Sequence, residues 1–170
     1  MRQLALSIAA LLLAAAPAGA QTPTILSGGE AHSATPEVEV FGGYSYLRLY
    51  GFNNNGGIGA VTVNANSWLG FTGEVSGYVA EDPFDNNGLV VGGPKFTYRR
   101  GAVTPFVHVM AGGAFGGSDA AGALVLGGGV DAKISKHVAI RLIQADYVAT
   151  TFRSNNGRFS AGIVFRFGER

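Results

Sequence analysis

The chain has 170 residues, of which 27 are glycine, 47% are hydrophobic, 14% are charged and none is cysteine. A small soluble domain covers its surface with roughly 25–35% charged residues, and the absence of cysteine excludes disulfides, thiolate metal ligands and cysteine nucleophiles. The 12 basic and 11 acidic side chains nearly cancel, so the chain lacks the basic surplus on which nucleic-acid binding depends.

Residues 1–20 have the three regions of a secretory signal peptide. Arg2 supplies the positive start, residues 4–16 form an apolar core, and Ala18-Gly19-Ala20 is a small-residue cleavage site. The core is shorter than the ~20 apolar residues that span a bilayer. We therefore expect cleavage after Ala20, followed by a flexible linker over residues 21–36, which are rich in Thr, Ser, Gly, Ala and Pro.

Residues 37–170 repeat one plan, in which a run of alternating apolar and polar residues is followed by a link. A period of two predicts β-strands with two unlike faces. The runs cover residues 38–49, 60–66, 68–78, 89–99, 104–115, 123–133, 138–150 and 158–167.

Two kinds of link separate these eight runs. Tight turns are expected at residues 66–67, 100–101 and 135–137, and longer polar loops at 51–57, 80–88, 116–122 and 153–157. Short turns that alternate with longer loops are typical of an up-and-down barrel in an outer membrane. The predicted fold is therefore all-β, an eight-stranded antiparallel up-and-down transmembrane β-barrel, and the even strand number places both of its ends on the periplasmic side.

The run over residues 138–150 breaks the alternation. Arg141 lies on one parity, whereas Gln144 and Asp146 lie on the other. One extra residue near Leu142 and Ile143, a β-bulge, would bring all three polar side chains to the same face.

The last run shows both faces most clearly. Its apolar residues alternate with residues that are mostly polar or small, and the apolar set is Phe159, Ala161, Ile163, Phe165 and Phe167. Alternation alone allows either a membrane barrel with this face toward lipid or a soluble lipocalin-like barrel with a greasy cavity. The apolar face holds almost no charge and carries aromatic residues near strand ends, which favours the membrane barrel.

Several segments, taken in order, resemble the small outer-membrane β-barrel family, similar to the membrane domain of outer-membrane protein A. They are Phe41-Gly42-Gly43-Tyr44-Ser45-Tyr46, Gly73-Glu74-Val75-Ser76-Gly77-Tyr78, Thr104-Pro105-Phe106, Gly127-Gly128-Gly129-Val130-Asp131 and residues 160–167. Members of this class often end on an aromatic residue that the assembly machinery recognises. Here Gly168-Glu169-Arg170 follow Phe167.

Two sets of residues are the candidate sites. Ions of both signs on the polar face predict a paired network that fills the lumen, made of Glu74, Lys95, Arg99, His108, Asp131, Lys133, Arg141, Asp146 and Arg166. Aromatic residues near strand ends predict girdles at the two membrane interfaces, made of Tyr44, Tyr46, Trp68, Tyr98, Phe159 and Phe167.

These features predict a non-enzymatic outer-membrane protein with a structural, surface-scaffold role and at most a narrow, gated pore. We expect no cofactor, no metal and no nucleic acid, a monomer in outer-membrane lipid, and contact with the barrel-assembly machinery during insertion. Two alternatives stay open. One is a lipid-modifying outer-membrane enzyme with His108 as general base, for which no nucleophile is evident in the sequence. The other is a soluble periplasmic lipid-binding barrel.

Overall fold

The computed structural model describes residues 35–49, 52–79, 87–116, 119–151 and 153–168. The expected signal peptide and most of the expected linker lie outside these residues. Within them, no helix is long and apolar enough to cross a membrane. The predicted alternation gives eight strands, which are β1 (Val38–Leu49), β2 (Phe52–Asn64), β3 (Leu69–Val79), β4 (Asn87–Thr97), β5 (Val103–Gly116), β6 (Asp119–Lys133), β7 (Val138–Thr150) and β8 (Arg153–Phe167).

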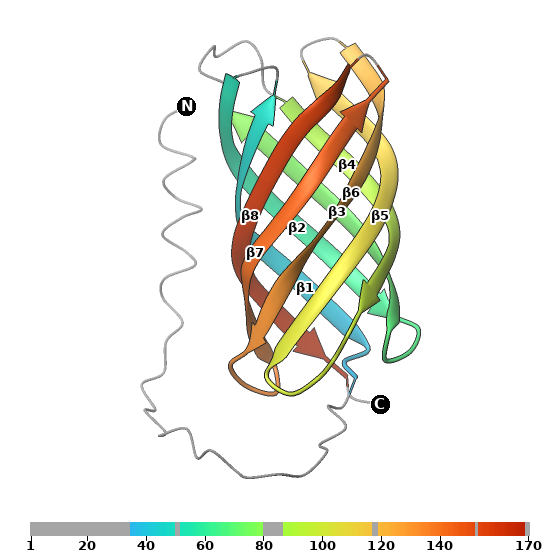
Figure 1. Cartoon of the computed structure of the whole chain (residues 1–170), viewed down its shortest axis with the longest axis vertical. Coiled ribbons are helices and arrows are strands. Elements are labelled where there is room, and N and C mark those ends of the chain that lie inside the picture. Colours follow the sequence, from blue (N-terminus) through green and yellow to red (C-terminus); the bar gives the residue numbers. More distant parts are fainter. Residues whose placement is uncertain (1–34, 50–51, 80–86, 117–118, 152, 169–170) are drawn as a thin grey trace. The chain divides into compact units, whose positions relative to one another are not determined.

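The strands form one closed antiparallel barrel in which each strand pairs with the next along the chain (Figure 1). The first and last strands close it, since Val38 faces Phe167 and Arg48 faces Gly157 along the β1–β8 seam. The end at which β1 begins and β8 ends is called the turn end. The opposite end, where β1, β3, β5 and β7 end, is called the loop end. The predicted eight-stranded up-and-down barrel is confirmed.

The apolar face points outward. Among the described residues, 26 large apolar side chains are exposed. In β8, Phe159, Ile163, Phe165 and Phe167 are exposed by 40–52%, whereas Arg158 is fully buried and Arg166 is 7% exposed. A soluble barrel with a greasy cavity would need the opposite arrangement, so the structure does not support that alternative.

The predicted β-bulge in β7 is confirmed. The pairing of β7 with β8 shifts between Arg141 and Gln144. Leu142 and Ile143 are both exposed, while Arg141 and Gln144 on either side of them are buried. The extra residue thus keeps the charged side chains of β7 inside the barrel along its whole length.

The predicted loops were placed too broadly. Residues 52–57 belong to β2, residues 119–122 to β6, and residues 153–157 to β8, so these polar, glycine-rich segments extend the strands toward the loop end. In the first case the ladder is supported by side chains, since the Tyr46 hydroxyl donates to Asn53 Oδ1 and Asn54 Nδ2 donates to the Leu47 carbonyl. Asn and Gly favour turns, but here these hydrogen bonds hold the asparagines in extended backbone.

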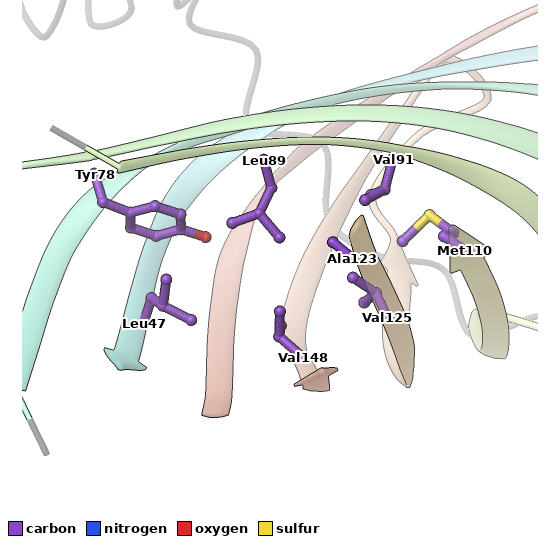
Figure 2. Close-up of a cluster of buried hydrophobic side chains, with 8 residues drawn as sticks. All are labelled: Leu47, Tyr78, Leu89, Val91, Met110, Ala123, Val125 and Val148. Atoms are coloured by element: carbon purple, nitrogen blue, oxygen red, sulfur yellow. The ribbon is translucent and has the colours of Figure 1, made fainter. Parts of the chain in front are cut away.

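The interior separates by polarity along the barrel axis. An apolar layer near the loop end brings together side chains from six strands (Figure 2), which are Leu47, Tyr78, Leu89, Val91, Met110, Ala123, Val125 and Val148. A smaller apolar group lies nearer the turn end, made of Phe41, Ile58, Ala60, Ala139 and Val164. The rest of the interior is polar and charged, and it holds the candidate site.

Candidate functional site

The interior of the barrel contains a network of charged side chains. Each projects inward because it lies on the same parity as the buried residues of its strand. The network includes five cations, one histidine and four carboxylates, namely Lys95, Arg99, Arg141, Arg158, Arg166, His108, Glu39, Glu74, Asp131 and Asp146. Buried charges require partners, and these side chains form three groups along the axis.

The first group lies at the turn end around the carboxylate of Glu39, on β1. Lys95 Nζ is 2.8 Å from Glu39 Oε2, and Arg99 Nη2 is 3.0 Å from Glu39 Oε1. The third cation, Arg166, only approaches Glu39 Oε1 to 3.9 Å through Nε. One carboxylate is therefore surrounded by three cations.

The second group is an ion pair between neighbouring strands. Arg141 Nε and Nη2 donate to the two oxygens of Asp131 at 2.8 and 3.1 Å, which is a bidentate pair. The guanidinium also lies over the rings of Phe41 and Phe106, at 4.1 and 4.3 Å from their centroids. Stacking on two rings and pairing along one edge fix the orientation of this side chain.

The third group lies in the middle of the barrel around Arg158, which is fully buried. Its Nη1 is 2.5 Å from Glu74 Oε1, and its Nη2 is 2.6 Å from Asp146 Oδ2. Asp146 also contacts His108, with 2.8 Å between Oδ1 and Nε2, and accepts a 2.8 Å hydrogen bond from Gln144 Nε2. The two carboxylates therefore share one guanidinium, but Asp146 has more additional partners than Glu74.

A short chain of hydroxyl groups separates these ions from the apolar layer. The Ser160 hydroxyl donates to Ser45 at 2.9 Å, and Ser45 contacts the Tyr78 hydroxyl at 2.9 Å. The ring of Tyr78 belongs to the apolar layer (Figure 2). Polarity therefore falls from ions through hydroxyls to hydrocarbon toward the loop end.

The structure buries eight of the nine residues of the predicted lumen network and brings them into the three groups. The exception is Lys133, whose side chain is exposed. It shares the parity of Asp131, but it is the last residue of β6 and lies beside the turn at residues 134–137. Its placement in the lumen was therefore wrong, because parity implies burial only where the barrel continues around the strand.

The network also includes three residues that the sequence analysis did not select. Glu39 and Arg158 each lie on the polar parity of their strands, so alternation alone could have identified them. Gln144 was placed on this face by the bulge but was not chosen because it is uncharged, although it bridges Arg141, Asp146 and Glu74.

The six predicted interface aromatics lie outside the barrel, three of them at the turn end and three in the middle part of β1 and β8. At the turn end, Trp68, Tyr98 and Phe167 are exposed by 52–61%, and Trp68 stacks on Phe96 with 6.1 Å between ring centroids. Toward the loop end, Tyr44 and Phe159 are exposed by 55% and 51%, and Tyr46 is half-buried. Phe71, Phe96, Phe115 and Tyr147 are further exposed aromatics that were not selected.

His108 has one neighbour that a catalytic histidine would need, and the serine hydroxyls of the lumen are engaged in other contacts. The ring contacts Asp146 and is tilted against Phe106, so a base and an orienting carboxylate are present. The buried serine hydroxyls of Ser45, Ser76 and Ser160 are engaged with one another, with Tyr78 or with Arg158. Within the part of the chain that the structure describes, no group of three acidic or histidine side chains could hold a metal ion.

The fold is similar to those of several solved structures. The N-terminal β-barrel domain of OprF from Pseudomonas aeruginosa is similar with a TM-score of 0.59 and 10% identity, over 78% of this chain and 98% of that one. Neisserial surface protein A matches with a TM-score of 0.54 and 17% identity, over 76% and 96%. The chain has the fold of the small outer-membrane β-barrels.

A third similar structure is that of the Yersinia pestis outer membrane protein Ail in a phospholipid bilayer nanodisc. It matches with a TM-score of 0.54 and 19% identity, over 78% of this chain and 99% of that one. No protein-family model and no curated protein sequence matches the chain. At these identities the likeness extends to the fold.

Proposed function

We propose that this protein is a structural barrel that spans the outer membrane of a bacterium with two membranes. One observation carries the proposal: the large apolar side chains face outward and the charged ones face inward. Monomeric soluble proteins rarely expose contiguous apolar patches above a few hundred Å². A closed antiparallel barrel leaves no unpaired strand edge, and an apolar band around it suits lipid.

The fold supports this location, since the similar protein Ail is an outer membrane protein solved in a bilayer. A signal peptide over residues 1–20 would direct the chain out of the cytoplasm. The turn end, where β1 begins and β8 ends, would then face the periplasm. We further propose that the barrel is a monomer in outer-membrane lipid and is inserted by the barrel-assembly machinery.

The interior favours a structural role over transport. Eight strands give a lumen that side chains fill. Here the ionic groups and the apolar layer near the loop end occupy successive levels of it. A hydrophobic constriction resists the entry of water and ions. We therefore propose a closed scaffold that presents its loop end at the cell surface and conducts ions at most through rare rearrangements of the interior.

The enzyme alternative has less support. His108 is 4% exposed and lies inside the lumen, whereas a lipid substrate would approach from the outer face. Its partner Asp146 is also bound by Arg158, so the pair is part of the ionic network. These contacts support a structural role for His108.

Fractionation of expressing cells tests the proposed location. The signal-processed protein is expected in the outer-membrane fraction, and its mobility on a gel is expected to change after boiling because a closed barrel resists detergent until it is heated. Val109→Arg tests the lipid contact of the outer face, because it places a cation on β5 at a position where Val109 is 43% exposed. Recovery of the unaltered protein in the soluble periplasmic fraction would overturn the proposal.

A further inference from the structure

The most unusual side chain of the interior is Arg166 on β8, because it is buried without a matching partner. The residue is 7% exposed, and both Nε and Nη2 are buried with no hydrogen-bond acceptor. Its nearest carboxylate oxygen, Glu39 Oε1, is 3.9 Å from Nε. A buried guanidinium that lacks acceptors is strongly unfavourable.

The two unpartnered nitrogens are those that grip carboxylates elsewhere in this barrel. Arg141 uses Nε and Nη2 to hold both oxygens of Asp131. Arg158 Nε donates to Asp146 Oδ2 at 2.8 Å, and its Nη2 lies 2.6 Å from the same oxygen. This edge of a guanidinium presents two parallel N–H donors that match the two oxygens of a carboxylate or phosphate. The same edge of Arg166 has no carboxylate within hydrogen-bond distance, since Glu39 Oε1 lies 3.9 Å from Nε.

Charge balance at the turn end points to the same ligand chemistry. The oxygens of Glu39 already accept Lys95 Nζ at 2.8 Å and Arg99 Nη2 at 3.0 Å. The group formed by Lys95, Arg99, Arg166 and Glu39 therefore carries two excess positive charges, while the side chain of Glu37 lies beside Gly168 at the same end. Water could accept hydrogen bonds from Arg166, but it could not neutralise this excess, whereas an oxyanion would do both.

Arg166 lies close to the turn end of the barrel. It is the residue before the last one of β8, which ends at Phe167. Arg99 lies beyond the end of β4 and is only half-buried as a residue, and its Nη1 donates to the carbonyl of exposed Ser67. The group is therefore within about one residue of the end of the strand ladder, ~3.3 Å per residue, rather than beneath the apolar layer at the other end.

We propose that the turn end of the lumen binds one small oxyanion, a phosphate or carboxylate group, through Nε and Nη2 of Arg166, with Arg99 and Lys95 adding charge. This binding would be independent of the membrane location proposed above. It would give the scaffold a ligand site near the end opposite the apolar layer.

The test follows the Nε–H resonance of Arg166 by nitrogen-15 NMR in the purified full chain, in detergent micelles or in buffer as its solubility requires. Inorganic phosphate, and separately acetate, is titrated at constant ionic strength with sodium chloride as the balance. We expect a saturable shift of the Arg166 signal with the oxyanions and no comparable shift with chloride. The signal is assigned by its loss in Arg166→Lys.

Two variants distinguish binding by the paired donors Nε and Nη2 of Arg166 from simple attraction by positive charge. Arg166→Lys keeps the positive charge but removes the paired donors, so phosphate binding measured on the remaining signals of Arg99 should weaken about tenfold or more. Lys133→Gln removes an exposed cation at the same end of the barrel and should leave the affinity unchanged. Unchanged gel mobility with and without boiling shows that each variant is folded.

Three outcomes would overturn the proposal. Chemical shifts that respond to chloride as well as to phosphate would indicate an effect of ionic strength alone. The absence of any saturable shift would indicate that water accepts the hydrogen bonds of Arg166 Nε and Nη2. The third outcome is a phosphate response that appears only after Glu37→Gln and Glu169→Gln are combined. That result would show that a carboxylate of the chain itself occupies the site. A failure of the outer-membrane proposal would show instead in fractionation and leave these titrations unaffected.

Discussion

The replacement of Arg158 by methionine should strongly destabilise the barrel. Arg158 is fully buried and shared by Glu74, at 2.5 Å, and Asp146, at 2.6 Å. Methionine retains much of the length of the side chain but supplies no charge and no donors. Both carboxylates would then lie in the lumen without their principal cation, and the loss of one partner of a buried pair typically destabilises a protein by about 3–5 kcal/mol.

The two carboxylates should not suffer equally. Asp146 keeps His108 at 2.8 Å and Gln144 at 2.8 Å, whereas Glu74 keeps only a 3.4 Å contact between Oε2 and Gln144 among the side chains that the structure describes. Adding Glu74→Gln to Arg158→Met should therefore restore about half or more of the lost free energy of unfolding. Adding Asp146→Asn should restore less, because the neutral amide also disturbs the His108 contact.

Urea unfolding of the folded barrel in micelles or lipid vesicles measures these differences. Trp68 is the only tryptophan in the sequence and is 55% exposed on the outer surface near the turn end, so its fluorescence reports on contact with lipid. Lys136→Met is the matched control, because it removes an exposed cation from a turn. Its effect should stay within about 0.5 kcal/mol.

A cost of Arg158→Met no larger than that of Lys136→Met would contradict the prediction. A better rescue by Asp146→Asn than by Glu74→Gln would contradict it as well. The first result would mean that water reaches the middle of the lumen and solvates the carboxylates. The second would mean that the hydrogen bonds of Asp146 do not compensate its charge.

Three further predictions address the seam, the outer face and the lumen. Gly43→Ala should destabilise the fold by about 1–3 kcal/mol in the same urea assay, because a Cβ there would lie 2.2 Å from the Ala161 carbonyl oxygen. The control is Gly73→Ala, which should be neutral because nothing lies within 4 Å of the added Cβ. Equal effects of the two substitutions would contradict this prediction. Val109→Arg should cost about 2–4 kcal/mol in lipid vesicles and much less in water-rich micelles; no difference between the two would argue against lipid contact. The unaltered barrel should show no steady conductance in planar bilayers, whereas the double variant Met110→Ser, Val125→Ser should conduct ions. Conduction by the unaltered barrel as well as by the double variant would show that the apolar layer is no barrier.

The two faces of the barrel could be predicted because successive side chains of a strand point to opposite faces, and apolar residues alternate with polar ones. Along β8 from Asn156 to Phe167, the inward and outward positions follow from parity. Even the bulge in β7 was predictable, since Arg141 and Asp146 lie on opposite parities and only an extra residue brings both inside. Fold class and strand number followed directly from these local signals.

The ends of the strands and the partners of the charges could not be predicted in the same way. Asn53, Asn54 and Asn55 have turn propensity, but cross-strand pairing and hydrogen bonds to β1 keep them extended. Ion pairs across the lumen depend on the stagger between strands, which alternation does not encode. Lys95 on β4 and Glu39 on β1, for example, are 56 residues apart and meet only because of this stagger.

The same long-range pairs give the ionic interior a consequence for folding. Hydrogen bonds of the backbone are satisfied in any register, but a slip by one residue turns every inward side chain of a strand toward lipid. In β8 such a slip would expose Arg158 and Arg166 to hydrocarbon, where each cation costs about 2–4 kcal/mol near the midplane. It would also separate Arg158 from Glu74, 84 positions away in the numbering, and Ser160 from Ser45. The network therefore penalises misregister at the β1–β8 seam, the one pairing that no short link along the chain enforces.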